Sequence, residues 1–160
     1  MSDLLIDLQA FTESLPPLLR WVGVVLAALI PYVEAEGASI IGIVAGIHPA
    51  IAIPAAVVGN AIALAVIIAI TSAVRAGVTR NRVPEANPKK QRMRRVLDRW
   101  GVPGVSFLGP LLLPSHVTAA AMVGFGAPKA RVFGWGVVAV AAWALVLGVL
   151  VYLGVQVALH

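Results

Sequence analysis

The sequence predicts an all-α integral membrane protein. We expect about three full transmembrane helices, two re-entrant helical hairpins in inverted orientation, an N-terminal amphipathic surface helix and a basic cytoplasmic helix. Of the 160 residues, 60% are hydrophobic and 12% are charged, whereas soluble domains are about 45–50% apolar and about 25% charged. Such a chain could not fold in water without large exposed apolar patches. Two long uncharged runs, residues 37–74 and 101–128, flank a strongly basic segment.

Residues 1–15 predict an amphipathic helix that lies on the membrane surface. Its acidic residues differ from the basic start of a cleaved signal peptide, so we expect the mature protein to keep its first membrane segment. Pro16 and Pro17 end the helix. The apolar face recurs at helical spacing and consists of Leu4, Leu8, Phe11 and Leu15.

Residues 16–160 predict a single membrane domain, which begins with an apolar segment at 17–33. This segment is just long enough to cross the bilayer. Arg20 and Trp21 near its start are suited to the membrane interface. We therefore predict a full span here.

The uncharged run that follows is too long for one crossing. As a single helix it would extend about 57 Å at about 1.5 Å per residue, whereas the hydrocarbon core is about 30 Å thick. Pro49 and Pro54 are the residues most suited to break it. We predict a re-entrant hairpin at 34–53 and a full span at 54–74.

The basic residues gather in the segment 75–100. Lys- and Arg-rich loops next to membrane spans stay in the cytoplasm, so we predict a cytoplasmic loop with a surface helix at 88–100. We also predict contact with anionic lipid headgroups, at about 1 kcal/mol per basic residue. The net charge of +5 does not indicate a nucleic-acid partner, because it is concentrated beside membrane spans. The predicted lipid-contacting residues are Arg80, Arg82, Lys89, Lys90, Arg92, Arg94, Arg95 and Arg99.

The second uncharged run, residues 101–128, contains too many prolines and glycines for one regular helix. We predict a second re-entrant hairpin with its tip near Pro110 and Pro114, followed by a final span at 132–159. In the alternative topology the chain has four plain spans, and residues 101–128 cross the bilayer completely.

The distribution of charge predicts the topology. With the basic segment in the cytoplasm, the span at 54–74 runs from outside to inside, and Lys129 and Arg131 also lie inside. The first hairpin then enters from the outer face and the second from the cytoplasmic face. A hairpin followed by a span thus occurs twice in opposite orientations, which is the pattern of inverted-repeat transporters.

Glu34 and Glu36 lie in the apolar stretch PYVEAEGASIIGIVAG. A carboxylate inside the bilayer costs about 2.5–3.5 kcal/mol, so it usually faces a water-filled cavity, pairs with a base or takes up a proton. One interpretation is a proton or cation site in a polar cavity, with His48, Asn60 and His116 as candidate partners. The other is a solvated pair at the outer headgroup boundary, with Asn60 as an interhelical hydrogen-bonding residue.

The sequence contains no convincing catalytic arrangement. Ser115 and His116 are adjacent and lack an acidic residue to orient the histidine. Zinc-protease and phosphate-loop motifs are absent. We predict that the protein is not an enzyme and has neither a cofactor nor a metal site.

The order of motifs resembles the small multidrug export protein family, which is related to the DedA/VTT-type membrane proteins. The similarity covers residues 29–144: the stretch containing the glutamates, VVGNAIALAVIIAI, the basic linker, RWGVPGVSFLGPLLLP and AAMVGFGAPKARVFGWGVV. It implies two inverted re-entrant hairpins and a role in moving or organising lipids or other amphiphiles. The matching positions are Glu34, Gly37, Gly46, Gly59, Asn60, Gly101, Pro110, Pro114, Gly124 and Gly136.

The chain departs from that family in both hairpins. The family has a basic residue and then glycine after its glutamate, whereas this chain has Glu36, and no proline follows until Pro49. The second hairpin of the family reads Pro-x-Pro-Gly-Thr-Gly, whereas PLLLPSHVTAA lacks the glycines. The ion pair that the family could form within its first hairpin therefore lacks its base here.

We expect a multi-pass protein of the bacterial inner membrane that transports or organises lipids or other amphiphiles, with Glu34 or Glu36 as a candidate proton carrier. An alternative is a non-catalytic accessory subunit of a larger lipid-transporter complex, because about three spans enclose little interior and small residues favour helix docking. A third interpretation is a surface-anchored scaffold that uses the basic helix. The expected partners are membrane lipids, and either a larger membrane complex or a homo-oligomer.

Overall fold

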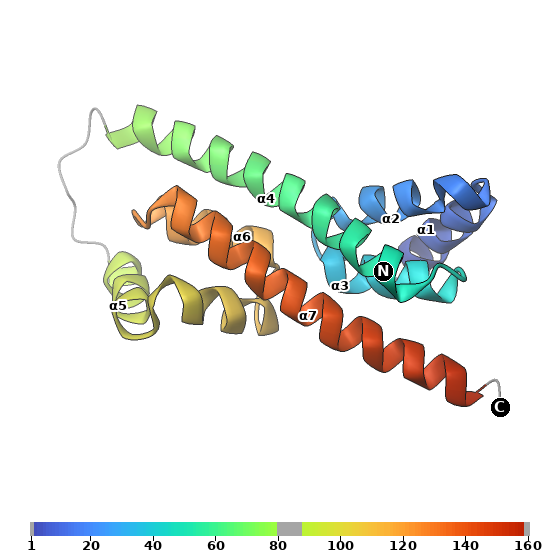
Figure 1. Ribbon diagram of the computed structural model, residues 1–160. Helices are drawn as coiled ribbons and strands as arrows, with labels where there is room; N and C mark the ends of the chain where they lie inside the picture. The colour runs from blue at the N-terminus through green and yellow to red at the C-terminus, as the bar shows by residue number, and fades with distance from the viewer. Residues whose placement is uncertain (1, 80–87, 159–160) are drawn as a thin grey trace. The chain divides into compact units, whose positions relative to one another are not determined.

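The computed structural model describes residues 2–79 and 88–158, and these residues form helices without any strand. The predicted all-α class is therefore confirmed. In chain order the helices are α1 (Ser2–Ser14), η1 (Pro17–Leu19), α2 (Arg20–Ala28), α3 (Glu34–Val44), α4 (Pro49–Thr79), α5 (Pro88–Leu108), η2 (Gly109–Leu111), α6 (Ser115–Gly124) and α7 (Lys129–Ala158), as Figure 1 shows.

The chain forms two compact units where the sequence predicts a single membrane domain. Unit 1 consists of Met1–Ala63 and Val140–His160, and unit 2 consists of Leu64–Ala139. Both long helices contribute to both units. Helix α4 begins in unit 1 and ends in unit 2, whereas α7 begins in unit 2 and ends in unit 1.

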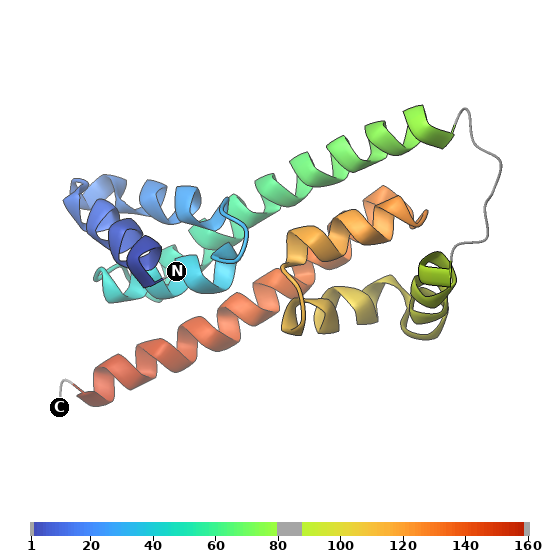
Figure 2. The same cartoon turned by 180° about the vertical axis from the view of Figure 1, so that it is seen from behind.

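Unit 1 is built around a helical hairpin of α2 and α3, and α1 lies against this hairpin in both ribbon views (Figures 1 and 2). Small residues allow the helices to approach closely. A Cβ added at Gly42 of α3 would lie 2.7 Å from the Val24 side chain of α2 and 3.0 Å from that of Ala52 on α4. Close packing of this kind depends on small side chains at the contact. The fully buried alanines of unit 1 are Ala27, Ala28, Ala35, Ala38, Ala52, Ala56 and Ala144.

The first hairpin turns at a different place from the one that the sequence predicts. Residues 17–33 do not form one spanning helix, because α2 ends at Ala28 and the chain reverses before α3 begins. The η1 and α2 segment, Pro17–Ala28, is shorter than the two long helices. The prediction of a full span here is wrong, and so is that of a hairpin contained within 34–53. That range holds α3, a junction and the start of α4.

The two prolines predicted to break the first uncharged run have different roles. Pro49 is the first residue of α4, where the missing N–H would have no helical partner in any case. Pro54 lies inside α4, so its prediction as a hairpin breaker is wrong. A proline inside an apolar helix removes one backbone hydrogen bond without ending the helix when its surroundings compensate.

Unit 2 contains the second helical hairpin, formed by α5 and α6. Gly101 divides α5, with φ 64° and ψ −179°, a conformation that glycine adopts without a Cβ clash. The kink falls where the sequence predicts the boundary between the basic helix and the hairpin. Pro110 lies in η2 and Pro114 is the N-cap residue of α6, so both predicted breakers lie at the hairpin tip. A Cβ added at Gly109 would lie 2.5 Å from the Thr118 side chain.

The junctions before the two long helices have the same backbone geometry. At the end of α3, the N–H of Ile47 donates to the carbonyl of Gly42 at 2.9 Å, and the N–H of Gly46 donates to that of Ile43 at 3.0 Å. Both bonds recur 80 residues later at the end of α6, again at 2.9 and 3.0 Å. Gly46 has φ 83° and Gly126 has φ 106°. These are two Schellman motifs with glycine at the left-handed position.

The buried positions of the long helices repeat with the same offset. Ala52 and Leu64 of α4 are fully buried, and so are Val132 and Ala144 of α7. The two halves of the chain therefore repeat one plan of hairpin, glycine junction and long helix.

Helices α4 and α7 are the described helices that are long and apolar enough to cross a membrane, at Pro49–Gly77 and Lys129–Val157. Each qualifying segment has 29 residues, or about 43 Å at about 1.5 Å per residue. That length exceeds the hydrocarbon core of about 30 Å. Two such helices suggest a membrane protein. The sequence predicts about three full spans, which is one more than the number of these helices.

Candidate polar site in unit 1

The candidate site begins at the turn between α2 and α3. Tyr32 and Glu34 have φ angles of 74° and 52°, in the left-handed region that costs residues other than glycine on the order of 1–3 kcal/mol each. The N–H groups of Val33 and Glu34 both donate to the carbonyl of Ile30, at 3.1 Å. Backbone strain of this kind gathers at functional sites, so this turn is a candidate for one.

The two glutamates lie in the first turn of α3, where the helix dipole favours negative charge. Glu34 is buried, with 7% of its surface exposed, whereas Glu36 is half-buried. Residues two apart on a helix point to different sides, so the two carboxylates occupy different surroundings. Glu34 is the buried carboxylate of unit 1.

The candidate partners of the glutamates belong to different segments of the chain and differ in burial. Asn60 is fully buried on α4 within unit 1. His48 is exposed, its Nδ1 accepts a hydrogen bond from the Ala50 N–H at 3.2 Å, and its ring centroid lies 6.2 Å from that of Tyr152. His48 therefore caps the start of α4 at the surface. His116 is buried, with 3% exposed, but belongs to α6 in unit 2.

Several buried hydroxyl groups gave no signal in the sequence. Ser39 of α3 is fully buried and donates to the carbonyl of Glu36 at 2.8 Å. In unit 2, Thr118 of α6 donates to the carbonyl of Pro114 at 3.2 Å, next to buried Ser115. The second helix of each hairpin thus carries buried polar groups among apolar residues. A short uncharged hydroxyl does not interrupt a hydrophobic pattern, and only its position just after a hairpin turn could have marked it.

Arg20 joins the ends of two helices in unit 1. Its Nη1 donates to the carbonyl of Ala45, the C-cap of α3, at 3.1 Å. Its Nε and Nη2 donate at 3.4 Å to the carbonyls of Leu15 and Glu13 at the end of α1. A cation at a helix C-terminus satisfies free carbonyls and interacts favourably with the helix dipole. Arg20 therefore fixes α1 to the hairpin that carries the glutamates.

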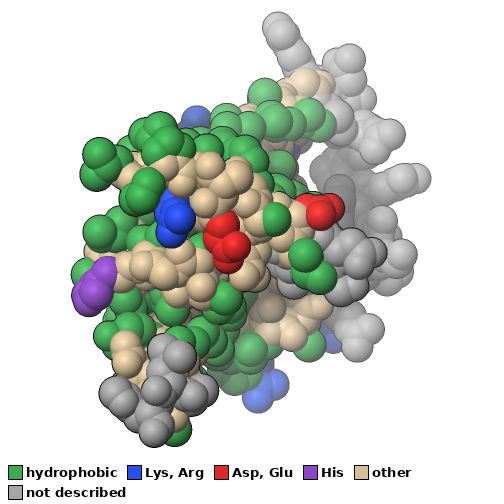
Figure 3. All heavy atoms as spheres, turned by 90° about the vertical axis from the view of Figure 1, so that its right-hand side faces the viewer, with side chains coloured by type: hydrophobic (Ala, Val, Ile, Leu, Met, Phe, Trp, Pro, Cys, Tyr) green, Lys and Arg blue, Asp and Glu red, His purple; other side chains and the backbone are tan. Residues whose placement is uncertain are grey.

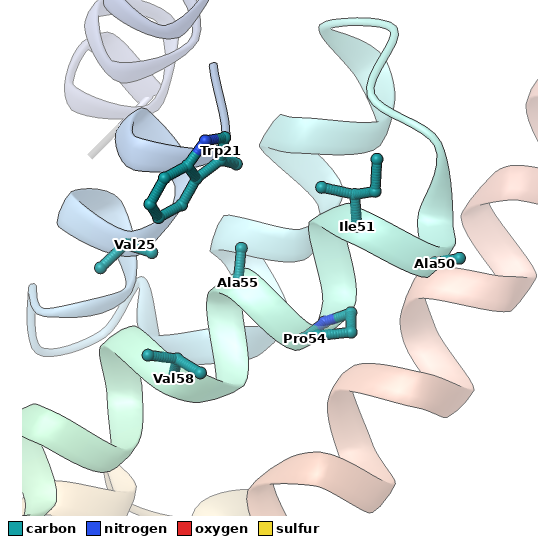
Figure 4. A pocket seen from close by; sticks show the side chains of 7 residues that line it. All are labelled: Trp21, Val25, Ala50, Ile51, Pro54, Ala55 and Val58. Atoms are coloured by element: carbon teal, nitrogen blue, oxygen red, sulfur yellow. The ribbon is translucent and has the colours of Figure 1, made fainter. Parts of the chain in front are cut away.

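A shallow apolar groove of about 350 Å³, here groove 1, lies between α2 and α4 of unit 1 (Figure 4). Trp21 and Val25 line it from α2. The space-filling view shows a few separate charged side chains on a visible face that is mostly hydrophobic side chains and uncharged atoms (Figure 3). The residues that line groove 1 from α4 are Ala50, Ile51, Pro54, Ala55 and Val58.

The basic residues predicted to contact lipid lie in part outside the described chain. Arg80 and Arg82 are outside the described residues, and Lys89, Lys90, Arg92 and Arg94 belong to α5. Arg95 and Arg99 are exposed on α5, and the Arg99 guanidinium lies 5.8 Å from the ring centroid of Trp100. Within residues 2–79 and 88–158, no three His, Asp or Glu side chains gather in a metal-binding arrangement.

Comparisons with protein-family models, curated proteins and solved structures gave no match to this chain. The resemblance to the small multidrug export protein family therefore stays a prediction.

Proposed function

We propose that this chain is a multi-pass membrane protein that moves or organises lipids or other amphiphiles, using two hairpin-and-helix repeats of opposite orientation. The supporting observation is the internal repeat: a helical hairpin and a Schellman junction precede each long apolar helix. Transporters built from inverted repeats place their substrate and ion sites at interrupted helices. A relation to the DedA/VTT-type proteins would account for the same arrangement.

In the proposed topology, unit 2 carries the cytoplasmic segment and the chain lies in the bacterial inner membrane. Unit 2 contains eleven of the twelve basic residues and two of the seven acidic ones, a formal charge of +9, which leaves −4 for the rest of the chain. Basic segments beside spans stay in the cytoplasm.

Cysteine labelling tests this topology, because the chain has no cysteine of its own. Leu18, which is 87% exposed in unit 1, and exposed Arg95 in unit 2 are each replaced by cysteine. A membrane-impermeant maleimide applied to intact cells should label Leu18→Cys, and should label Arg95→Cys only after permeabilisation. The opposite pattern contradicts the proposed orientation.

Glu34 is the proposed proton carrier, because it is the buried carboxylate at the strained turn of the first hairpin. The test measures movement of a fluorescent phospholipid across vesicles that contain the purified protein, with and without a pH gradient. Glu34→Gln should abolish the pH dependence, whereas Glu13→Gln, at an exposed position of α1, should retain it. If Glu34→Gln keeps the pH dependence of the native protein, the proposed proton coupling through Glu34 is wrong. If the native protein moves no lipid, the proposed transport function is wrong.

A second candidate function is that of a non-catalytic accessory subunit of a larger lipid transporter. In the most apolar 18 residues of each long helix, only 39% are buried within the chain in α4 and only 22% in α7. These helices leave surface for other helices to cover. Purification in mild detergent followed by mass spectrometry separates the two functions: a stoichiometric large membrane partner supports the accessory subunit, and a homodimer alone supports the transporter.

A further inference from the structure

Unit 2 carries a groove at the position that corresponds to groove 1. This shallow hollow of about 390 Å³, here groove 2, lies along the first part of α7. Each of its lining residues follows a residue of groove 1 by 80 positions, the same offset that relates the two Schellman junctions. Ile51, Pro54, Ala55 and Val58 of groove 1 correspond in this order to Arg131, Gly134, Trp135 and Val138 of groove 2.

The two grooves differ most at their first position, where an isoleucine in groove 1 corresponds to an arginine in groove 2. Arg131 is exposed, and no hydrogen bond or ion pair to it is found in the part of the chain that the structure describes. Groove 1 has a tryptophan from α2, Trp21, whereas the tryptophan of groove 2, Trp135, belongs to α7 itself. Groove 2 therefore combines an available cation with an amphipathic ring, and groove 1 has no charged residue.

The order of side chains along groove 2, cationic, aromatic and then aliphatic, matches the order of headgroup and acyl chain in a phospholipid. Positions i, i+3, i+4 and i+7 of a helix lie on one face, and Arg131 and Val138 are separated by about 10 Å at about 1.5 Å per residue. The guanidinium can bind a phosphate through two parallel hydrogen bonds. Tryptophan is suited to the level between headgroups and chains, and Val138 offers an aliphatic surface beyond it.

We propose that groove 2 binds an anionic phospholipid, with the phosphate on Arg131 and one acyl chain along Trp135 and Val138. Its counterpart, groove 1, accepts an acyl chain without selecting the headgroup. The formal charges of the units, +9 for unit 2 and −4 for unit 1, favour an anionic occupant in groove 2 only. The inference rests on the membrane setting of the proposed function but does not require that the bound lipid is transported.

Lipid binding to the purified full-length protein tests the site. Phosphatidylglycerol or phosphatidylcholine is titrated in detergent, and bound lipid is counted by native mass spectrometry. The native protein should bind the anionic lipid about tenfold more tightly, and Arg131→Gln should lose this preference, because a charge-assisted hydrogen bond contributes about 1.5–3 kcal/mol. Lys129→Gln removes the same charge outside the lining of groove 2 and should keep the preference. The proposed site is wrong if the native protein binds both lipids equally, or if Arg131→Gln and Lys129→Gln lose the same amount of preference for the anionic lipid.

The converse substitution, Ile51→Arg, places a cation at the equivalent position of groove 1. This variant should bind one additional anionic lipid, and it provides a test even if Arg131→Gln does not fold. A folded Ile51→Arg protein that gains no lipid contradicts the correspondence of the grooves. A photoreactive residue at Val138 that crosslinks to a protein instead of lipid would also overturn the proposed occupant.

The same variants are compared in the lipid-movement assay, which separates this site from the proposed function. Arg131→Gln that moves lipid normally but has lost selective binding supports a resident lipid site. Absence of movement by the native protein contradicts the transport function and leaves the binding result interpretable.

Discussion

Unit 1 and unit 2 share a helical plan but differ in their chemistry. Each contains a helical hairpin, a Schellman junction, the start of one long helix and the end of the other. Unit 1 has a buried glutamate and a net negative charge, whereas unit 2 has a buried histidine and nearly all the basic residues. Small residues and glycine caps therefore maintain the same backbone plan in both halves, while the polar side chains differ between them.

The helix contacts of the two units also differ at equivalent positions. A Cβ added at Gly59 of α4 would collide with the carbonyl oxygen of Val25 on α2, and would lie 2.9 Å from the Ala28 side chain. The residue 80 positions later is Ala139, which is fully buried. Unit 2 therefore has room for a methyl group where unit 1 has none.

The largest expected effect is that of Gly59→Ala. The new methyl group must displace the α2 backbone, so we expect a loss of about 3 kcal/mol in the free energy of unfolding. The matched substitution in unit 2, Ala139→Gly, should cost only about 1 kcal/mol. Chemical denaturation in detergent, followed by tryptophan fluorescence, measures both. Similar losses in the two variants would contradict the difference in helix approach.

An intermediate effect is expected for Arg20→Gln, which removes the guanidinium from the ends of α1 and α3. Hydrogen bonds to a charged group contribute about 1.5–3 kcal/mol, and three carbonyls lose their donor, so we expect a loss of about 2 kcal/mol. The control is Arg99→Gln, because Arg99 also precedes a tryptophan but is exposed.

Limited proteolysis at the α1–α2 connection shows whether the effect is local. Arg20→Gln should be cleaved there faster than the native protein, and Arg99→Gln should be cleaved at the native rate. Equal behaviour of the two variants would show that Arg20 does not fix α1 to the hairpin.

The sequence predicted those parts of the fold in which a residue type has only one usual structural role. The long uncharged runs indicated apolar helices, and Gly101, Pro110 and Pro114 marked the kink and tip of the second hairpin. Pro54 departs from the prediction, because a proline can either end a helix or lie inside one, and packing decides between these outcomes. The turn at Tyr32 was not predictable, since no glycine or asparagine marks its left-handed backbone.

The candidate site was predictable where a polar residue interrupts an apolar stretch, as at Glu34 and Asn60. Glu34 is conspicuous in an apolar stretch, but only the folded chain shows that it is buried whereas Glu36 is half-buried. Ser39 and Thr118 are short polar residues among alanines, and only the folded hairpins show that they are buried. The correspondence of the grooves was equally hidden, because Arg131 and Trp135 share no chemistry with Ile51 and Ala55.

The smallest expected effects concern the feature that the units share, the glycine of each Schellman junction. Gly46 has open space around its missing Cβ, so Gly46→Ala should cost only the strain of its positive φ, about 1 kcal/mol. Gly126 has a larger φ, and an added Cβ would lie 3.1 Å from Arg75, so Gly126→Ala should cost slightly more, about 1.5 kcal/mol.

Two helical glycines with open space provide the controls, Gly154 in unit 1 and Gly77 in unit 2. Alanine at either should be neutral or should stabilise the helix by up to about 1 kcal/mol. Denaturation of the four variants tests whether the two junction glycines have the same structural role or share only their spacing of 80 residues. If both junction variants lose stability while both controls do not, the two glycines serve the same purpose in both halves. If only one junction variant loses stability, the two junctions share a backbone geometry but not a structural role. The correspondence between grooves 1 and 2 then loses its structural basis.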